Sequence, residues 1–141
     1  MNTADNFLRI IIFLIIVFVV IQFIPYGKDH TNPPVVKEPS WDTPQTRELA
    51  KQYCFDCHSN ETTWPWYSNI APASWLVTRD VEEGRSNLNF SDCAASTKLD
   101  EAPDEISEGG MPPIQYTLIH PKPSDADRQA LAQGLSNSPC K

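Results

Sequence analysis

The stretch Cys54-Phe55-Asp56-Cys57-His58 places two cysteines three positions apart and a histidine directly after the second. This spacing is the attachment signature of a c-type haem. The two thiols add to the two vinyl groups of the porphyrin, and the adjacent histidine then lies under the iron as its proximal ligand. The motif therefore predicts one covalent haem c held by Cys54, Cys57 and His58.

Two other interpretations of the cysteine pair remain open. A structural zinc site usually takes a second close pair, and the remaining cysteines, Cys93 and Cys140, are isolated in the sequence. A thioredoxin-like dithiol would require a βαβ setting, which this proline-rich chain does not offer. Covalent haem is favoured because demanding residue types occupy every fixed position of its signature.

The distal ligand of such a haem has few candidates. His30 lies in a proline-rich stretch and Met1 precedes an apolar run, which leaves Met111 and His120. Met111 stands in Gly-Gly-Met-Pro-Pro, residues 109–113, where the glycines let the backbone approach a flat cofactor and the prolines stiffen the loop. We expect Met111 on the iron, with His120 or an open distal position as alternatives.

Length and composition predict a small, loop-rich helical fold. The 141 residues are enough for one domain with attachments. The 13 prolines argue against long strands and long helices, and a haem would supply apolar surface that the soluble part lacks. We expect a mostly α, cytochrome c-like domain around one haem. The net charge of −7 argues against nucleic-acid binding.

The N-terminal stretch Phe7–Ile24 is apolar apart from Arg9 and Gln22. As a helix it would span about 27 Å, enough to cross a bilayer. A cleaved signal peptide and a buried core helix are the alternatives, and the first would want small residues at a cleavage site. We predict a transmembrane anchor at residues 1–24, a proline-rich linker at 25–39 and a haem-binding domain at 40–141.

Local charge does not decide how this anchor is oriented. Arg9 lies on one side, and Lys28 and Lys37 lie on the other. Covalent haem attachment in bacteria takes place outside the cytoplasmic membrane, so we predict an inner N-terminus and a periplasmic or otherwise external haem domain. His30, in the linker, is expected in solvent.

Sequence signals predict three helices in the soluble part. One starts at Thr43-Pro44, one covers 72–83 and stops at Gly84, and one covers 124–135 with Ser124 as its cap. On the second helix the expected buried residues are Trp75, Leu76 and Val81. The aromatic residues at 64–67 suit a loop against a haem edge or over a small core. The acidic stretch 100–108 is either a solvated helix face or a docking patch.

Cys93 and Cys140 form an even pair outside the haem motif. In an oxidising compartment such a pair favours a disulfide, which would tie down the C-terminal end of the chain. Two free thiols remain the alternative.

Two stretches of this sequence resemble a known family. They are CFDCHSNETTWPWYSNIAPASWLVTRDVEEGRSNLNF, residues 54–90, and EGGMPPIQYTLIHP, residues 108–121. Both are similar to the haem-binding domain family of bacterial membrane-anchored monohaem proteins. The resemblance implies covalent haem on Cys54 and Cys57, proximal ligation by His58 and distal ligation by Met111. Where the family tends to carry a tryptophan, this sequence has Cys93, which fits a disulfide in place of a packing contact.

These observations favour a membrane-anchored monohaem cytochrome that passes electrons between redox partner proteins. A His/Met pair saturates the iron and suits one-electron carriage, so the sequence favours a carrier over an enzyme. The alternatives are a peroxidase-like haem enzyme or a gas or redox sensor with an open or labile distal position. A subunit that docks onto a larger respiratory or peroxidase complex is a third interpretation.

Overall fold

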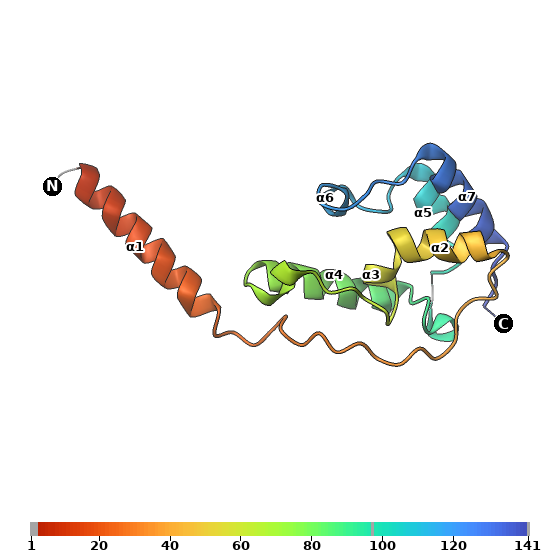
Figure 1. The fold of residues 1–141 in the computed structure, drawn as a ribbon, viewed down its shortest axis with the longest axis horizontal. Coiled ribbons are helices and arrows are strands. Elements are labelled where there is room, and N and C mark those ends of the chain that lie inside the picture. Colours follow the sequence, from red (N-terminus) through yellow and green to blue (C-terminus); the bar gives the residue numbers. More distant parts are fainter. Residues whose placement is uncertain (1–2, 97, 141) are drawn as a thin grey trace. The chain divides into compact units, whose positions relative to one another are not determined.

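The computed structural model describes residues 3–96 and 98–140, which are mostly α-helical (Figure 1). Among these residues there is no β-strand, only an isolated bridge between Lys37 and Asp92. The expected mostly α fold class is therefore confirmed. The elements are α1 (Thr3–Ile21), α2 (Pro44–Tyr53), α3 (Phe55–His58), the 3₁₀ turn η1 (Trp66–Asn69), α4 (Ala73–Asn87), the 3₁₀ turn η2 (Cys93–Ala95), α5 (Ala102–Glu108), α6 (Ile114–Thr117) and α7 (Asp125–Ser136).

The chain divides into two compact units. The first unit takes the residues up to Thr31 together with Trp64–Arg79, and the second takes Asn32–Thr63 together with the residues from Asp80 onward. The functional boundaries that the sequence suggests near residues 24 and 39 remain predictions.

Helix α1 is long and apolar enough to cross a membrane, and none of its described residues is buried. Its 19 residues correspond to about 28 Å of helix, close to the thickness of a bilayer's hydrocarbon core. The helix thus has the length and composition expected of an N-terminal span.

Side-chain caps set the start of α2 and of α7, as the sequence predicts. The Thr43 hydroxyl accepts a hydrogen bond from the backbone N–H of Thr46, at 3.2 Å. The Ser124 hydroxyl accepts one from the backbone N–H of Asp127, at 3.1 Å. Each cap satisfies a backbone donor that the first helical turn leaves unpaired, so both predicted starts are confirmed.

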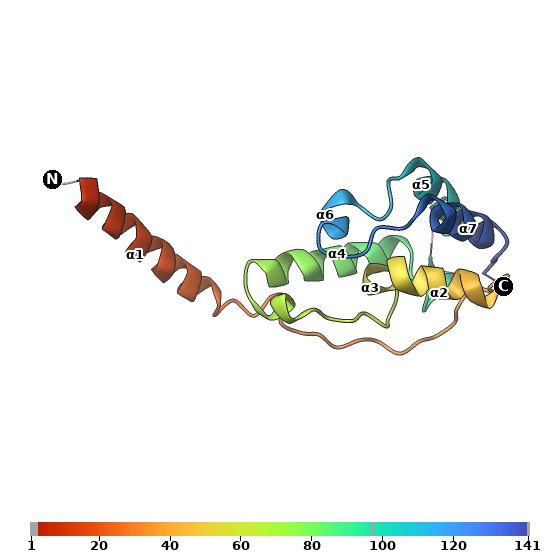
Figure 2. The ribbon, with the colours of Figure 1, turned by 45° about the horizontal axis from the view of Figure 1, so that its top comes forward.

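The core of the second unit forms where α7 packs against α2 and α5 (Figure 2). A glycine makes part of this packing possible, because a Cβ on Gly134 of α7 would collide with the side chain of Thr46 on α2. The buried apolar residues are Leu49, Ala50, Tyr53, Phe55, Leu88, Phe90, Leu99, Ala102, Ile106, Leu131, Ala132 and Leu135.

Helix α4 differs from its prediction at the C-terminal end. It continues through Gly84 to Asn87, so the predicted stop at Gly84 is wrong. Gly84 is not left-handed, since only Gly27 and Gly109 among the described glycines have positive φ. A Cβ at Gly84 would instead press on the backbone carbonyl of Cys57. The glycine therefore permits a close approach of α4 to the haem motif.

Burial along α4 was also only partly predicted. Val81 is buried as expected, and Trp75 is half-buried. Leu76, expected in the core, is 60% exposed.

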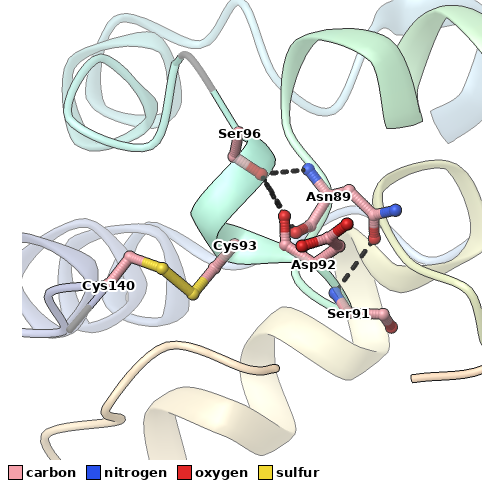
Figure 3. Close-up of a disulfide and its surroundings, with 6 residues drawn as sticks. All are labelled: Asn89, Ser91, Asp92, Cys93, Ser96 and Cys140. Atoms are coloured by element: carbon pink, nitrogen blue, oxygen red, sulfur yellow. Dashed lines mark hydrogen bonds between the residues drawn. A yellow bond between two sulfur atoms is a disulfide. The ribbon is translucent and has the colours of Figure 1, made fainter. Parts of the chain in front are cut away.

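A disulfide joins Cys93 of η2 to Cys140 near the C-terminus, with the two Cα atoms 5.7 Å apart (Figure 3). Cys93 is buried in the core of the unit. The residues before it form a compact turn, in which the Ser96 hydroxyl accepts from Asn89 N–H and donates to the Asn89 carbonyl. The bridge thus connects the end of the chain to a turn that follows α4.

Candidate haem site

The Cys-x-x-Cys-His motif lies on one short helical turn at the end of α2. Cys54 separates α2 from α3, and its carbonyl accepts hydrogen bonds from the backbone N–H groups of Cys57 and His58, at 3.2 and 2.8 Å. This turn brings both thiols and the imidazole to one cavity of the second unit.

The cavity has a volume of about 480 Å³, within the range of roughly 300–1,000 Å³ typical of cofactor sites. All four predicted haem-binding residues line this cavity, namely Cys54, Cys57, His58 and Met111. The other lining residues come from α2, the end of α4, α5, the loop around α6, and α7, and include Tyr53, Leu88, Phe90, Ala102, Ile106, Pro112, Pro113, Tyr116 and Leu131.

The imidazole of His58 is held in an orientation that suits a metal ligand. Its Nδ1 lies 3.1 Å from the carbonyl oxygen of Gly84 and 3.0 Å from that of Leu88, both at the end of α4. Nδ1 therefore carries the proton and donates it, which leaves the Nε2 lone pair available. Burial lowers the pKa of His58, although the two carbonyls oppose this. The neutral form that can bind iron is thus favoured.

Cys54 and Cys57 are free thiols, not joined to each other. Burial raises the pKa of Cys54 to about 12 and that of Cys57 to about 11. Neighbouring carboxylates, first Asp80 and then Asp56, add to the shift at Cys57. Burial thus favours the protonated form of both thiols at neutral pH.

Met111 reaches the cavity on a rigid loop. Gly109 ends α5 with φ of 83°, and the N–H groups of Gly110 and Met111 both donate to the carbonyl of Glu105, at 2.9 and 3.2 Å. The following Met111–Pro112 bond is cis. The Met111 side chain lines the cavity and is 38% exposed.

The other two described histidines do not line this cavity. His120 stacks on the ring of Tyr116, with ring centroids 4.0 Å apart. His30 belongs to the first unit, where it stacks on Trp64 at 4.5 Å and its Nε2 lies 3.1 Å from the Ser68 carbonyl. The expectation that His30 is a solvated linker residue is wrong.

Several residues of the site were not found by sequence reasoning. The hydroxyl of Tyr116 donates to Asp56 Oδ2 at 3.0 Å, which ties the loop after Met111 to the haem motif. Burial, followed by the charge of Asp56, raises the pKa of Tyr116. The carbonyls of Gly84 and Leu88 were missed as well. Backbone acceptors and a partner 60 positions away leave no local sequence signal.

Charge around the cavity is predominantly negative. The lining carboxylates are Asp56, Asp80, Glu83, Glu101 and Glu105, and the lining cations are Lys98 and Arg128. Arg128 is oriented by a hydrogen bond of 3.0 Å from its Nη1 to the Ile106 carbonyl. Lys98 Nζ lies 4.0 Å from Glu101 Oε2, so the two lining cations differ in that Lys98 already faces a carboxylate.

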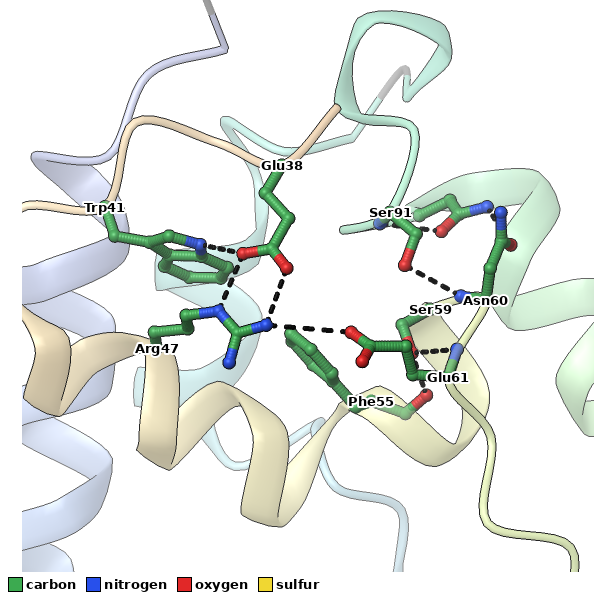
Figure 4. Close-up of polar contacts among 9 residues, drawn as sticks. Glu38, Trp41, Arg47, Phe55, Ser59, Asn60, Glu61 and Ser91 are labelled. Carbon is green, nitrogen blue, oxygen red and sulfur yellow. Dashed lines mark hydrogen bonds and ion pairs between the residues drawn. The ribbon is translucent and has the colours of Figure 1, made fainter. Parts of the chain in front are cut away.

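A polar network supports the outer side of the haem motif (Figure 4). Arg47 of α2 donates to both carboxylate oxygens of Glu38, at 2.7 and 2.6 Å, and its guanidinium carbon lies 5.5 Å from the centroid of the Phe55 ring. The indole N–H of Trp41 also donates to Glu38. Arg47 is the first cause of a lowered Glu38 pKa. The network holds the segment before α2 against α2, the helix that leads into the haem motif.

The aromatic residues at 64–67 do not line the cavity, so of the two predicted roles, a loop against a haem edge or over a small core, the first is not supported. Trp64, Trp66 and Tyr67 belong to the first unit, and Trp66 is 76% exposed. They therefore need an explanation other than haem binding.

Comparison with known proteins gives one family. A family model described as a haem-binding domain matches residues 16–137, which is most of the chain. Comparisons with curated proteins and with solved structures found no significant match.

Proposed function

Because this chain belongs to the haem-binding domain family, we propose that it is a membrane-anchored monohaem c-type cytochrome that carries single electrons between redox partners. The observation that carries this proposal is the meeting of Cys54, Cys57, His58 and Met111 at one cavity. When bound, the haem supplies an iron that takes up and releases one electron.

Cys54 and Cys57 are the residues that would hold the haem covalently. Both are free, both line the cavity, and the turn between α2 and α3 presents them together. His58 would bind through Nε2, while the Gly84 and Leu88 carbonyls keep its ring from rotating. Such acceptors increase the basicity of the ligand, which favours the more positively charged, oxidised state of the site.

Met111 would be the second protein ligand of the haem iron, since it lines the same cavity as His58. With both residues bound, the iron would have no open position for water or peroxide, which suits a carrier. The exposure of Met111, 38%, supports a second candidate function. A sulfur that leaves the site would open it for a peroxidase-like reaction or for sensing a gas.

The charged lining divides into two roles in this proposal. Lys98 and Arg128 would pair with the propionates of the haem, since they are the cations that line the cavity. The five lining carboxylates would stabilise the oxidised state by Coulomb attraction. They also favour a redox partner with a basic surface.

The proposed location follows from α1 and from the covalent attachment. Helix α1 would span the bacterial cytoplasmic membrane with its N-terminus inside, and the second unit would lie on the periplasmic side. The partner would be another redox protein there, or a larger respiratory or peroxidase complex.

The test is the absorption spectrum of the haem-loaded full chain in detergent, oxidised and reduced, with and without carbon monoxide. A carrier gives a low-spin spectrum with the weak sulfur-to-iron charge-transfer band, unchanged by carbon monoxide. Met111→Ala should abolish that band, whereas Ile114→Ala, at a residue 78% exposed, should keep it. A wild-type spectrum that is high-spin and shifts with carbon monoxide would reject the carrier and support the enzyme or sensor.

A further inference from the structure

We infer that the segment Trp66–Leu76 of the first unit is a second membrane contact, which sits in the lipid headgroup region beside the end of α1. This inference rests on the proposed function in one respect, namely that α1 spans the bilayer. It adds a binding surface for lipid that is separate from the span and from the haem cavity.

The segment is fastened to the end of α1 by a pair of hydrogen bonds. The side-chain amide of Gln22 donates to the carbonyl of Ala71 at 2.9 Å and accepts from the N–H of Ala71 at 3.0 Å. Gln22 directly follows the last residue of α1. Where α1 leaves the hydrocarbon core, Ala71 must therefore be at the same depth.

A second contact fixes the same junction. Gly27 has φ of 80°, and a Cβ there would collide with the carbonyl of Ser74 at the start of α4. The chain after α1 thus returns along the beginning of α4. Both contacts lie within the first unit, so they describe one compact body.

Several large apolar side chains near this junction have a high exposed fraction, which is unfavourable in water. The exposed residues are Phe23 at 83%, Ile24 at 42%, Tyr26 at 45%, Trp66 at 76%, Ile70 at 39% and Leu76 at 60%. Single exposed apolar residues are ordinary, whereas several in one compact unit, all within a few positions of the residues that form these two contacts, indicate an interaction surface.

Composition identifies lipid as the partner. The chain contains 11 Lys and Arg and 18 Asp and Glu, yet no charged residue occurs from Trp64 to Thr78. The same stretch holds three of the four tryptophans in the sequence, of which Trp66 is 76% exposed and Trp64 and Trp75 are half-buried. Tryptophan and tyrosine are enriched where hydrocarbon meets headgroups, because their rings are apolar and their tips are polar. A protein partner would more often supply charges to a rim.

The aromatic loop is held in place before it meets a membrane. His30 stacks on Trp64, and its ring nitrogen reaches the carbonyl of Ser68, at 3.1 Å. The Ser68 hydroxyl in turn donates to the carbonyl of Pro65. Trp66 lies within this braced loop, so little conformational entropy is lost when it enters the interface.

Nitroxide depth measurements test the inference on the haem-loaded full chain in vesicles of phosphatidylcholine and phosphatidylglycerol. Leu76→Cys carries the label at the proposed contact, Ile15→Cys carries it in α1, and Gln45→Cys, exposed on α2, is the aqueous control. Collisions with oxygen report lipid, and collisions with a water-soluble nickel chelate report water. We expect the oxygen-to-nickel ratio at position 76 to be several-fold above that at 45 and below that at 15.

The outcomes separate this inference from the proposed anchor. A deep label at 15 with a label at 76 as nickel-accessible as at 45 would overturn the second contact and leave the span intact. A nickel-accessible label at 15 would overturn the anchor, and with it this inference. Spin–spin broadening at 76 would mean that a second copy of the chain covers the surface. Trp66→Cys repeats the measurement if Leu76→Cys does not accumulate with haem.

Discussion

In the second unit, Phe55, Phe90 and Leu131 are at most 2% exposed, whereas in the first unit Phe23, Trp66 and Leu76 are at least 60% exposed. Burying one such side chain contributes roughly 1.5–3 kcal/mol in water. The second unit therefore has a core of the kind that water and a haem would stabilise. The first unit instead exposes large apolar side chains, as expected of a surface that contacts lipid.

The largest expected effect concerns the covalent haem proposed for the cavity of the second unit. Changing Cys54→Ser together with Cys57→Ser should abolish covalent haem, because serine hydroxyls do not form the thioether bonds. Haem staining of the denatured chain after electrophoresis measures this. The matched control, Cys93→Ser with Cys140→Ser, should keep the stain. Haem that stays on the denatured Cys54→Ser, Cys57→Ser chain would contradict covalent attachment through these two cysteines.

The next effect concerns how the second unit is closed. Replacing both Cys93 and Cys140 by alanine should lower the free energy of unfolding by about 4 kcal/mol, since the bridge closes a 47-residue separation. Urea unfolding of the haem-loaded protein, followed by tryptophan fluorescence, gives the value. An unchanged midpoint would show that α7 holds the C-terminal end without the bridge.

A matched leucine pair sharpens the comparison directly. Leu131→Ala should cost about 3 kcal/mol, within the range for a buried leucine, because Leu131 is 2% exposed. Leu76→Ala should cost under about 0.5 kcal/mol, because Leu76 is 60% exposed. Both are measured in detergent by urea unfolding. Equal losses would mean that the two units do not differ in how they use apolar residues.

The smallest expected change in unfolding free energy concerns the partly exposed ion pair between Glu38 and Arg47 in the second unit. Arg47 lowers the pKa of Glu38 below its ordinary value, so the folded state prefers the carboxylate. Its stabilisation is complete above the unfolded pKa and is lost as pH falls through the folded pKa, in the region below about pH 4. Glu38→Gln should therefore cost less than about 1 kcal/mol at pH 7.

The pH series provides the check for this ion pair. The difference in unfolding free energy between wild type and Glu38→Gln, followed from pH 7 down to pH 3, should shrink. A difference that stays constant or grows toward acid would contradict the assigned pairing.

Local signals were enough to predict part of the fold and to select four candidate ligands, Cys54, Cys57, His58 and Met111, which line one cavity. Thr43 and Ser124 mark helix starts because a cap acts within three residues, and the haem motif is likewise contiguous. Gly84 misled because a glycine near a helix end serves equally as a stop or as a close contact, and only the distant Cys57 decides between them.

The first unit was harder to predict for a different physical reason. Leu76 was expected in the core beside Val81, but five positions along a helix turn a side chain by about 140°, and Leu76 is 60% exposed whereas Val81 is 2% exposed. The role of His30 depends on its stacking partner Trp64, which lies 34 positions later in the sequence. Side-chain pairs so far apart become visible only once the chain is folded.

The disulfide has a consequence for how the protein is made. The four cysteines are in two chemical states, since Cys93 and Cys140 form a disulfide while Cys54 and Cys57 are free thiols. Under the proposed haem attachment, Cys54 and Cys57 must still be reduced when haem is attached, in a compartment that oxidises Cys93 and Cys140. Maturation therefore has to sort thiols. Chain order assists, because Cys54 and Cys57 emerge before Cys93 meets its partner.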